Sequence, residues 1–113
     1  IGAGAVNFAG KTDFKLAGAI IRSAGFYLGN DSGLSHIAAA VGTPGLVIFG
    51  STTRELGFFP FRSRLKVAEA DVRCRPCSHI GKKSCPKGHF RCMENISAEN
   101  ITKSAVKMLT NTQ

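Results

Sequence analysis

The sequence predicts an α/β fold in which a Rossmann-like parallel sheet is flanked by helices. Residues 26–50 read in order as a strand, a polar turn, a helix, a glycine-proline turn and a second strand. The second strand, residues 46–49, is a continuous apolar run of the kind that is buried on both faces of a sheet. These patterns predict one βαβ unit, in which apolar residues recur at helical spacing between the strands: Leu34, Ile37, Ala38 and Val41.

A helix is expected to precede this unit, from residue 12 or 13 to about residue 23. It begins with a capping residue, and its apolar residues fall on one face: Phe14, Ala17, Ile20, Ile21 and Ala24. Gly25 ends this helix, and the first strand follows over residues 25–29. The central helix is expected to begin within residues 30–33 and to end at Gly42, with Pro44 preventing its continuation.

Further segments follow the βαβ unit. Residues 55–61 are apolar around a proline and are expected to form a loop packed by its phenylalanines. Residues 64–68 alternate between basic and apolar residues, which predicts another strand at an edge of the sheet. Residues 72–95 read as an irregular loop. A final helix over about 97–110 is capped by Ser97 and is expected to bury one stripe of residues: Ile101, Ala105, Met108 and Leu109.

Composition restricts the class of protein. The chain has 113 residues, of which 43% are hydrophobic, so it is expected to form one globular domain or part of one. No apolar run has the length of a membrane span, and the N-terminal residues lack the pattern of a signal peptide. Because the chain does not begin with Met, it reads as a fragment or processed piece of a cytoplasmic protein.

The charge of the chain predicts an anionic partner. With a formal net charge of +8, candidates are a nucleotide, a phosphorylated lipid, a membrane surface and a nucleic acid. A solvated face and a basic rim that meets a phosphate-rich acceptor both account for the way the charge is distributed. Nine of the fifteen Lys and Arg residues lie between residues 62 and 91: Arg62, Arg64, Lys66, Arg73, Arg75, Lys82, Lys83, Lys87 and Arg91.

The polar turn at residues 30–33 is a candidate ligand site. It follows the carboxyl end of a strand and opens onto a helix N-terminus, which is where open α/β sheets bind ligands. The first amides of a helix lack internal partners and carry partial positive charge, which suits a phosphate or diphosphate. Gly33 would let such an anion approach the backbone, and the Ser32 hydroxyl could donate to it or cap the helix.

Other polar residues around this turn are candidates for the same site. A carboxylate would be repelled by a diphosphate, so Asp31 is better assigned to accepting hydrogen bonds from a neighbouring sugar. His36 lies one turn along the same helix face and could reach the same ligand. Ser51 and Thr52 follow the second strand and are expected on the same rim. The alternatives are an ordinary helix cap and an ordinary solvent loop.

Cysteines are concentrated in the irregular segment, at Cys74, Cys77, Cys85 and Cys92. A tetrahedral zinc ion takes four such ligands, and the first two form the C-x-x-C pair that commonly begins a zinc site. The segment also contains substitute ligands, His79 and His89. Reduced thiols in a packed loop, and disulfides formed under oxidising conditions, are the alternatives. A catalytic thiol is not expected, because no Cys-His-acid arrangement is visible.

These residues carry a family resemblance. The run NFAGKTDFKLAGAIIRSAGFYLGNDSGLSHIAAAVGTPGLVIFGST, residues 7–52, resembles the C-terminal domain of glycosyltransferase family 9, the ADP-heptose:lipopolysaccharide heptosyltransferases. The pattern CRPC, CPKGH and CM, residues 74–93, is similar to the cysteine-rich segment of the heptosyltransferase II branch. The resemblance covers nearly all of the chain, and two separate motifs in the expected order make it specific at the level of the family.

The resemblance implies the C-terminal half of a GT-B glycosyltransferase. Residues 1–113 would then be an incomplete nucleotide-sugar-binding domain that contains the cysteine-rich loop at 72–95. By the same resemblance, Asp31 holds the heptose hydroxyls, Ser32 and Gly33 bind the diphosphate, and His36 lies near the donor sugar. No catalytic residue is expected in this chain, since the resemblance places the base in an N-terminal domain.

The implied activity is inverting transfer of heptose from ADP-heptose to the lipopolysaccharide inner core. The chemistry is expected to need no cofactor, and the cysteines are a candidate structural zinc site. The expected location is cytoplasmic and peripheral to the inner membrane, whose anionic surface is a candidate partner, with no nucleic acid partner. The alternatives are another nucleotide-sugar enzyme, such as an epimerase or a UDP-sugar transferase, and a basic zinc-knuckle module that binds nucleic acid.

Overall fold

The predicted α/β fold is confirmed by the computed structural model, which describes residues 3–111. The ends of the predicted domain, residues 1–2 and 112–113, lie outside the described residues. The sheet has three parallel strands in the order β1-β2-β3: β1 Tyr27–Asn30, β2 Gly45–Phe49 and β3 Leu65–Glu69. As expected, β3 is an edge strand.

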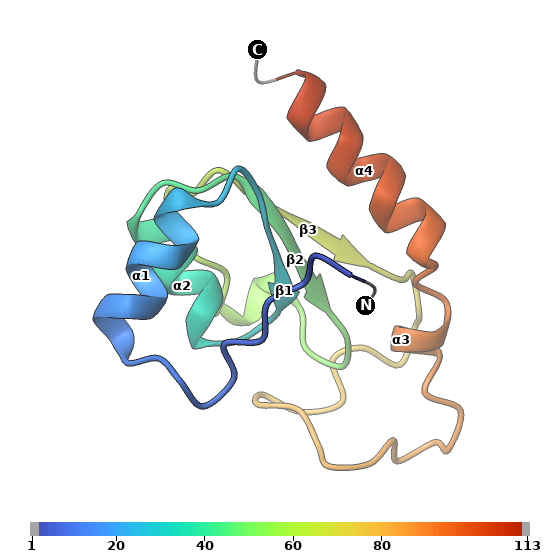
Figure 1. The fold of residues 1–113 in the computed structure, drawn as a ribbon. Coiled ribbons are helices and arrows are strands. Elements are labelled where there is room, and N and C mark those ends of the chain that lie inside the picture. The colour runs from blue at the N-terminus through green and yellow to red at the C-terminus, as the bar shows by residue number, and fades with distance from the viewer. Residues whose placement is uncertain (1–2, 112–113) are drawn as a thin grey trace.

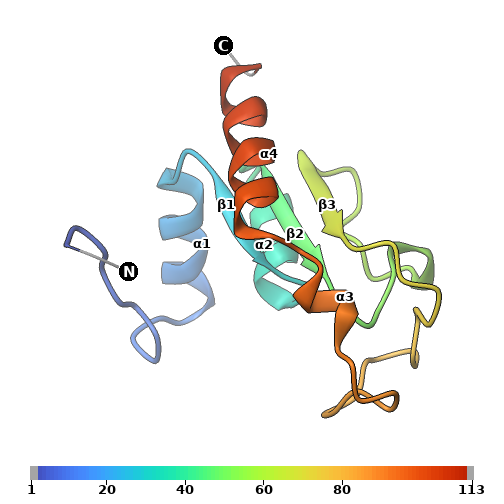
Figure 2. The ribbon, with the colours of Figure 1, turned by 90° about the vertical axis from the view of Figure 1, so that its right-hand side faces the viewer.

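Helices cover both faces of this sheet. Figures 1 and 2 show α1 and α2 on one face and α4 on the other. The long loop between β3 and α3 passes below the carboxyl ends of the strands in Figure 1. No helix within the described part of the chain is long and apolar enough to cross a membrane. The bounds of the helices are α1 Phe14–Ser23, α2 Gly33–Ala40, α3 Arg91–Glu94 and α4 Ala98–Thr110, with a 3₁₀ turn at Arg54–Leu56.

The core is built on β2, which pairs on both sides. Val47 lies opposite Gly29 of β1 and Val67 of β3. Val47 and Phe49 are fully buried, and full burial of such a side chain contributes roughly 1.5–3 kcal/mol. The core residues are Ala38, Val47, Phe49 and Leu65, with Ile21, Tyr27, Ala39, Phe59 and Val67 packed around them. The apolar run that predicted a strand buried on both faces is therefore confirmed.

Local sequence signals account for the ends of the helices. Asp13 caps α1 by accepting a 2.8 Å hydrogen bond from the Leu16 amide. Ser97 caps α4 in the same way, with a 3.1 Å bond from the Asn100 amide. Gly42 follows α2 with a positive φ of 78°, which favours glycine. Both expected capping residues and the glycine stop are thus confirmed.

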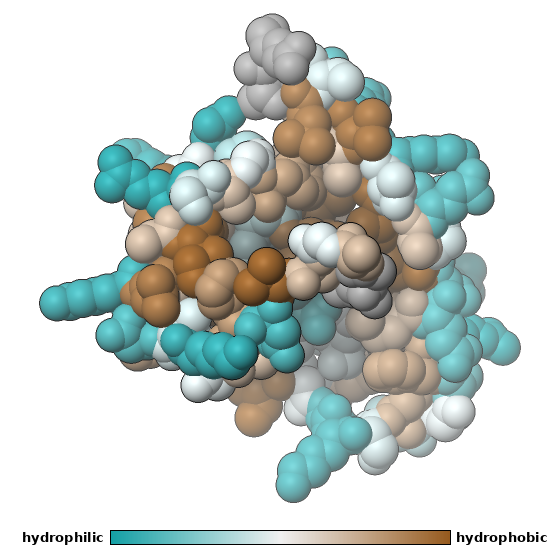
Figure 3. Space-filling model, viewed as in Figure 1, coloured by the Kyte–Doolittle hydropathy of each residue, from teal (hydrophilic) through white to brown (hydrophobic). Residues whose placement is uncertain are grey.

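Several expectations about packing are wrong. Phe14 is 85% exposed although it belongs to the predicted apolar face of α1, and Phe61 is 82% exposed in the loop that its phenylalanines were expected to pack. The expected stripe of α4 is only half-buried at best, with Leu109 at 42% exposure, because α4 packs mainly against β2. Figure 3 shows the resulting hydrophobic side chains over α1 and near the end of α4. The predicted irregular segment also contains α3.

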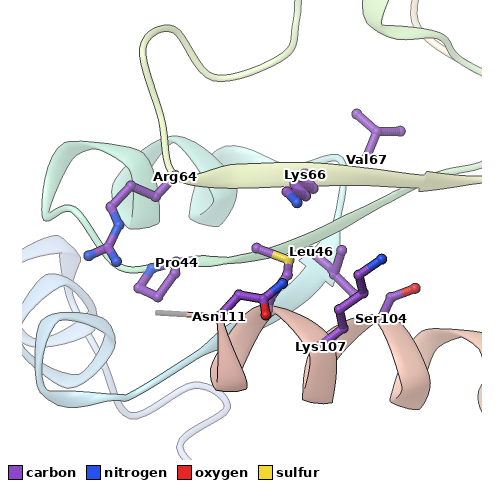
Figure 4. Close-up of a pocket in the computed structure, with 9 residues that line it drawn as sticks. Pro44, Leu46, Arg64, Lys66, Val67, Ser104, Lys107 and Asn111 are labelled. Carbon is purple, nitrogen blue, oxygen red and sulfur yellow. The ribbon is translucent and has the colours of Figure 1, made fainter. Parts of the chain in front are cut away.

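A groove of about 340 Å³ separates α4 from the sheet. Figure 4 shows Arg64 and Lys66 reaching it from the β3 side and Lys107 from α4, while Pro44 and Leu46 form its floor. It opens near the amino ends of β2 and β3. The groove therefore lies away from the carboxyl ends of the strands, where the sequence predicts a ligand site.

Candidate functional site

The turn between β1 and α2 has the predicted form. Ser32 has extended backbone angles, φ −158° and ψ 172°, and α2 begins at Gly33. Within the described residues its side chain makes no capping hydrogen bond to the helix. The next turn is stabilised instead by Ser35, whose buried hydroxyl donates to the Ser32 carbonyl at 2.7 Å. Ser32 thus occupies the N-cap position of α2 without capping the helix through its side chain.

Tyr27 lies beside this turn. Its side chain crosses Gly29, since a Cβ at Gly29 would collide with the Tyr27 hydroxyl. That hydroxyl forms a hydrogen bond with the Ser32 side chain. Burial raises the pKa of Tyr27, and the bond with Ser32 lowers it by less. Gly29 therefore makes room for the Tyr27 side chain and its contact with Ser32.

Asp31 is joined to the turn that follows β2. The Thr52 hydroxyl donates to the Asp31 carboxylate at 3.0 Å, and the Asp31 amide donates to the Ile48 carbonyl at 3.1 Å. The side chains of Asp31 and Thr52 are both half-buried. The carboxyl ends of the two strands thus meet at one edge, as the parallel pairing requires.

Two adjoining cavities lie over this edge. The first, of about 250 Å³, brings together five predicted site residues: Asp31, Ser32, Gly33, His36 and Thr52. The second, of about 490 Å³, is lined by Asp31, Thr52 and the remaining predicted residue, Ser51. All six predicted donor-site residues therefore border one composite pocket. Their role in binding stays a prediction.

The pocket also has a wall that the sequence reasoning missed. Residues 79–83 of the cysteine-rich loop line it: His79 and Ile80 face the first cavity, and Ile80, Lys82 and Lys83 face the second. Gly81 sits against Ser51, because a Cβ on Gly81 would lie 3.3 Å from the Ser51 hydroxyl oxygen. The only available signal was the Lys82-Lys83 pair, which was assigned to the general basic cluster.

Arg75 anchors the cysteine-rich loop to the turn after β2. Its side chain is only 7% exposed, whereas the other eight residues of the basic cluster are exposed. The guanidinium donates to the Gly50 carbonyl at 2.6 Å, the Thr52 carbonyl at 2.9 Å and the Ala70 carbonyl at 2.9 Å, and it pairs with Glu69 at 2.7 Å. Arg75 thereby connects the carboxyl end of β3, at Glu69, to the turn that contains Gly50 and Thr52.

All four cysteines are free thiols: Cys74, Cys77 and Cys85 lie in the loop before α3, and Cys92 lies in α3. The Cys74 sulfur is 3.7 Å from His89 Nε2, and the Cys77 thiol donates to the Cys74 carbonyl at 3.5 Å. Backbone amides, that of Phe90 above all, lower the pKa of Cys85. Burial raises the pKa of Cys92, and the charges of the other three cysteines add to this rise.

The predicted metal site is not formed in this arrangement. Within the described residues, no group of three or more His, Cys, Asp or Glu side chains is placed so that it could hold a metal ion. The thiols match zinc in their chemistry, but binding would require them to draw closer together. A structural zinc ion therefore stays a prediction.

Comparison with known proteins identifies the family of the chain. Residues 2–87 match the family model of glycosyltransferase family 9 (heptosyltransferase). The chain is 29% identical over 106 residues to lipooligosaccharide heptosyltransferase 2 of Campylobacter jejuni subsp. jejuni serotype O:2, covering 93% of this chain and 32% of that protein. It is 52% identical over 44 residues to lipopolysaccharide heptosyltransferase 3 of Escherichia coli K12, covering 39% of this chain and 13% of that protein.

The chain spans about a third of the Campylobacter protein, 32% of its length. No solved structure matches the chain. The family model covers well over half of the chain and includes every residue of the composite pocket up to Lys83. The chain belongs to glycosyltransferase family 9, the heptosyltransferase family.

Proposed function

We propose that the composite pocket binds the sugar-nucleotide donor of a heptosyltransferase, with ADP-heptose as donor and the lipopolysaccharide inner core as acceptor. The observation that carries the proposal is the Asp31 carboxylate, held by Thr52 at 3.0 Å beside the open N-terminus of α2. A fixed acceptor for sugar hydroxyls thus adjoins a group of backbone donors. The names of the matched relatives, which are lipooligosaccharide and lipopolysaccharide heptosyltransferases, support a heptose donor and an acceptor of that class.

The start of α2 is suited to the diphosphate. Its first amides carry partial positive charge and point out of the helix end. A Cβ at Gly33 would meet no atom within 4 Å among the described residues, so packing inside this chain does not require glycine there. Close approach of a ligand to the backbone would account for a glycine at this position. The Ser32 hydroxyl, which is not used as a cap, adds a side-chain donor.

Asp31 is suited to the sugar. A carboxylate has about four acceptor positions, so the bond from Thr52 leaves capacity for sugar hydroxyls. It would repel the phosphates, which directs them towards the helix amides and the sugar towards Asp31. His36 is exposed and lines the same cavity, where its ring can contact the donor sugar.

The proposed reaction is inverting transfer. The acceptor oxygen bonds to the anomeric carbon while the bond from that carbon to the diphosphate breaks, and ADP leaves with the electron pair. A base outside this chain takes the hydroxyl proton, and the amides of α2 stabilise the charge that develops on ADP. The chain therefore supplies the leaving-group half of the reaction and is expected to be inactive by itself.

Titration calorimetry of the 113-residue chain with ADP, UDP and ADP-heptose tests the proposal. ADP and ADP-heptose should bind, and Asp31→Ala should weaken ADP-heptose more than ADP. His36→Ala should likewise affect the sugar nucleotide more than ADP. Tighter binding of UDP would favour the alternative of a UDP-sugar enzyme, and absence of binding by ADP and ADP-heptose would overturn the proposal.

A further inference from the structure

We propose that residues 79–83 of the cysteine-rich loop form the phosphate-facing wall of the pocket, with Lys82 and Lys83 binding the diphosphate of the donor. This inference rests on the function proposed above. It adds a cationic subsite from a segment about fifty residues away from the Asp31 turn along the chain.

The larger cavity is lined by charged side chains of both signs. Its volume of about 490 Å³ extends from Asp31 and Thr52 at the strand ends to Lys82 and Lys83 on the loop. Both lysines are exposed. The ion pairs within residues 3–111 are Arg75–Glu69 and Lys103–Glu99, so neither Lys82 nor Lys83 is neutralised by a carboxylate there. Their charge is available to a ligand.

The charge of this cavity fits a nucleoside diphosphate. Asp31 contributes one negative charge and the two lysines contribute two positive charges, so the charged lining is net positive. A lysine ammonium is a compact point charge with three donors, which suits phosphate oxygens. Positive charge in a hollow surface also raises the local concentration of an anion. The lysines thereby offset the repulsion that Asp31 would exert on a diphosphate.

The loop that carries residues 79–83 is anchored to the turn at residues 50–52. The Cys77 amide donates to the Ser51 carbonyl at 3.1 Å, and Gly81, with φ +84°, packs against the Ser51 side chain. Arg75 adds its bonds to the Gly50 and Thr52 carbonyls, at 2.6 and 2.9 Å. Because these anchors lie on the 50–52 turn, the backbone that carries Lys82 and Lys83 has a defined position relative to Asp31.

Ile80 supplies an apolar surface between the two cavities. It lines both cavities and is 87% exposed, which is a high exposure for a large apolar side chain. A bound nucleotide sugar that spans the two cavities would remove part of this apolar surface from water. Ile80 thus lies where the two cavities adjoin.

The test is titration calorimetry of the 113-residue chain with ADP, adenosine and inorganic pyrophosphate at two salt concentrations. The double variant Lys82→Gln/Lys83→Gln should bind ADP and pyrophosphate about tenfold more weakly and with a shallower salt dependence, with adenosine binding unchanged, because charge-assisted phosphate contacts are lost. Lys82→Arg/Lys83→Arg should keep most of the affinity. The matched control Lys11→Gln/Lys15→Gln removes two exposed lysines outside the pocket and should have little effect.

The outcomes separate this inference from the function on which it rests. If the unaltered chain binds no ADP, the proposed function fails. If it binds ADP and the Gln double variant binds equally well, only the lysine subsite fails. Unchanged ADP binding with weaker binding to vesicles of phosphorylated lipid A would assign the lysines to acceptor phosphates and overturn the donor assignment. Circular dichroism of each variant checks that it folds.

Discussion

The Thr52 hydroxyl donates a 3.0 Å hydrogen bond to the Asp31 carboxylate, joining the turn after β2 to the turn after β1. Thr52 is held in turn through its carbonyl by Arg75, at 2.9 Å. The orientation of Asp31 therefore depends on a residue 44 positions further along the chain. This relationship makes the pocket a property of three segments, the two strand ends and the cysteine-rich loop.

Thr52→Val should weaken binding of the sugar nucleotide while keeping the Asp31 charge. Loss of the hydroxyl removes the hydrogen bond that holds the carboxylate, so the carboxylate can turn away from the sugar. We expect affinity to fall by about tenfold, the lower end of the range for a hydrogen bond to a charged group. Calorimetry with ADP-heptose measures the effect. Thr52→Ser retains the hydroxyl and should bind like the unaltered chain; equal losses in both variants would show that Thr52 acts through packing.

Arg75→Met should strongly destabilise the fold. The substitution leaves the Gly50, Thr52 and Ala70 carbonyls without their donor, and Glu69 without its partner. Because the side chain is 7% exposed, we expect a loss on the order of 2–4 kcal/mol in the free energy of unfolding. Urea denaturation measures this loss. Arg73→Met, at an exposed position two residues earlier, is the matched control and should change stability by less than about 0.5 kcal/mol.

Local pattern was sufficient to predict the parts of the fold that depend on neighbouring residues. The βαβ unit, the caps at Asp13 and Ser97 and the stop at Gly42 each follow from residues a few positions apart. The grouping of Asp31 with Thr52 followed from one topological rule, that parallel strands end at the same edge.

Contacts between distant segments could not be predicted in this way. In the sequence Arg75 resembles its eight exposed basic neighbours, and only the folded positions of three carbonyls distinguish it. The stripe on α4 has the period of a buried face, yet burial also requires a partner surface, and α4 meets mainly β2. The wall at 79–83 was missed for the same reason, since an irregular loop carries no period from which its neighbours can be inferred.

The zinc prediction is tested by metal analysis. Chain purified without chelators should contain about one zinc ion, because four thiols in one loop are a zinc-binding set. Binding should draw Cys74, Cys77, Cys85 and Cys92 together, so all four should resist alkylation until a chelator is added. Cys74→Ser should lower the zinc content, and Ser84→Ala is a control in the same loop. Full thiol reactivity in metal-free, folded chain would favour the alternative of reduced cysteines.

Tyr27 provides a spectroscopic probe of the Ser32 turn. The chain contains one Tyr and no Trp, so absorbance at about 295 nm reports the ionisation of Tyr27 alone. Burial raises the pKa of Tyr27 above its ordinary value of 10.0, so its titration midpoint should lie above that of free tyrosine. The bond with Ser32 lowers this pKa, so Ser32→Ala should move the midpoint further up. A midpoint unchanged by Ser32→Ala would show that the two hydroxyls are not in contact.

The raised pKa of Tyr27 also determines how its contribution to the free energy of unfolding changes with pH. The folded chain holds the phenolic proton more tightly than the unfolded chain, because its pKa is raised above 10.0. The contribution is therefore fully present below pH 10.0 and is lost as the pH rises through the folded-state pKa. Urea denaturation between neutral pH and about pH 11 should show this loss in the unaltered chain. Tyr27→Phe cannot ionise, so its stability should fall less over the same interval; parallel curves for the two proteins would contradict the assignment.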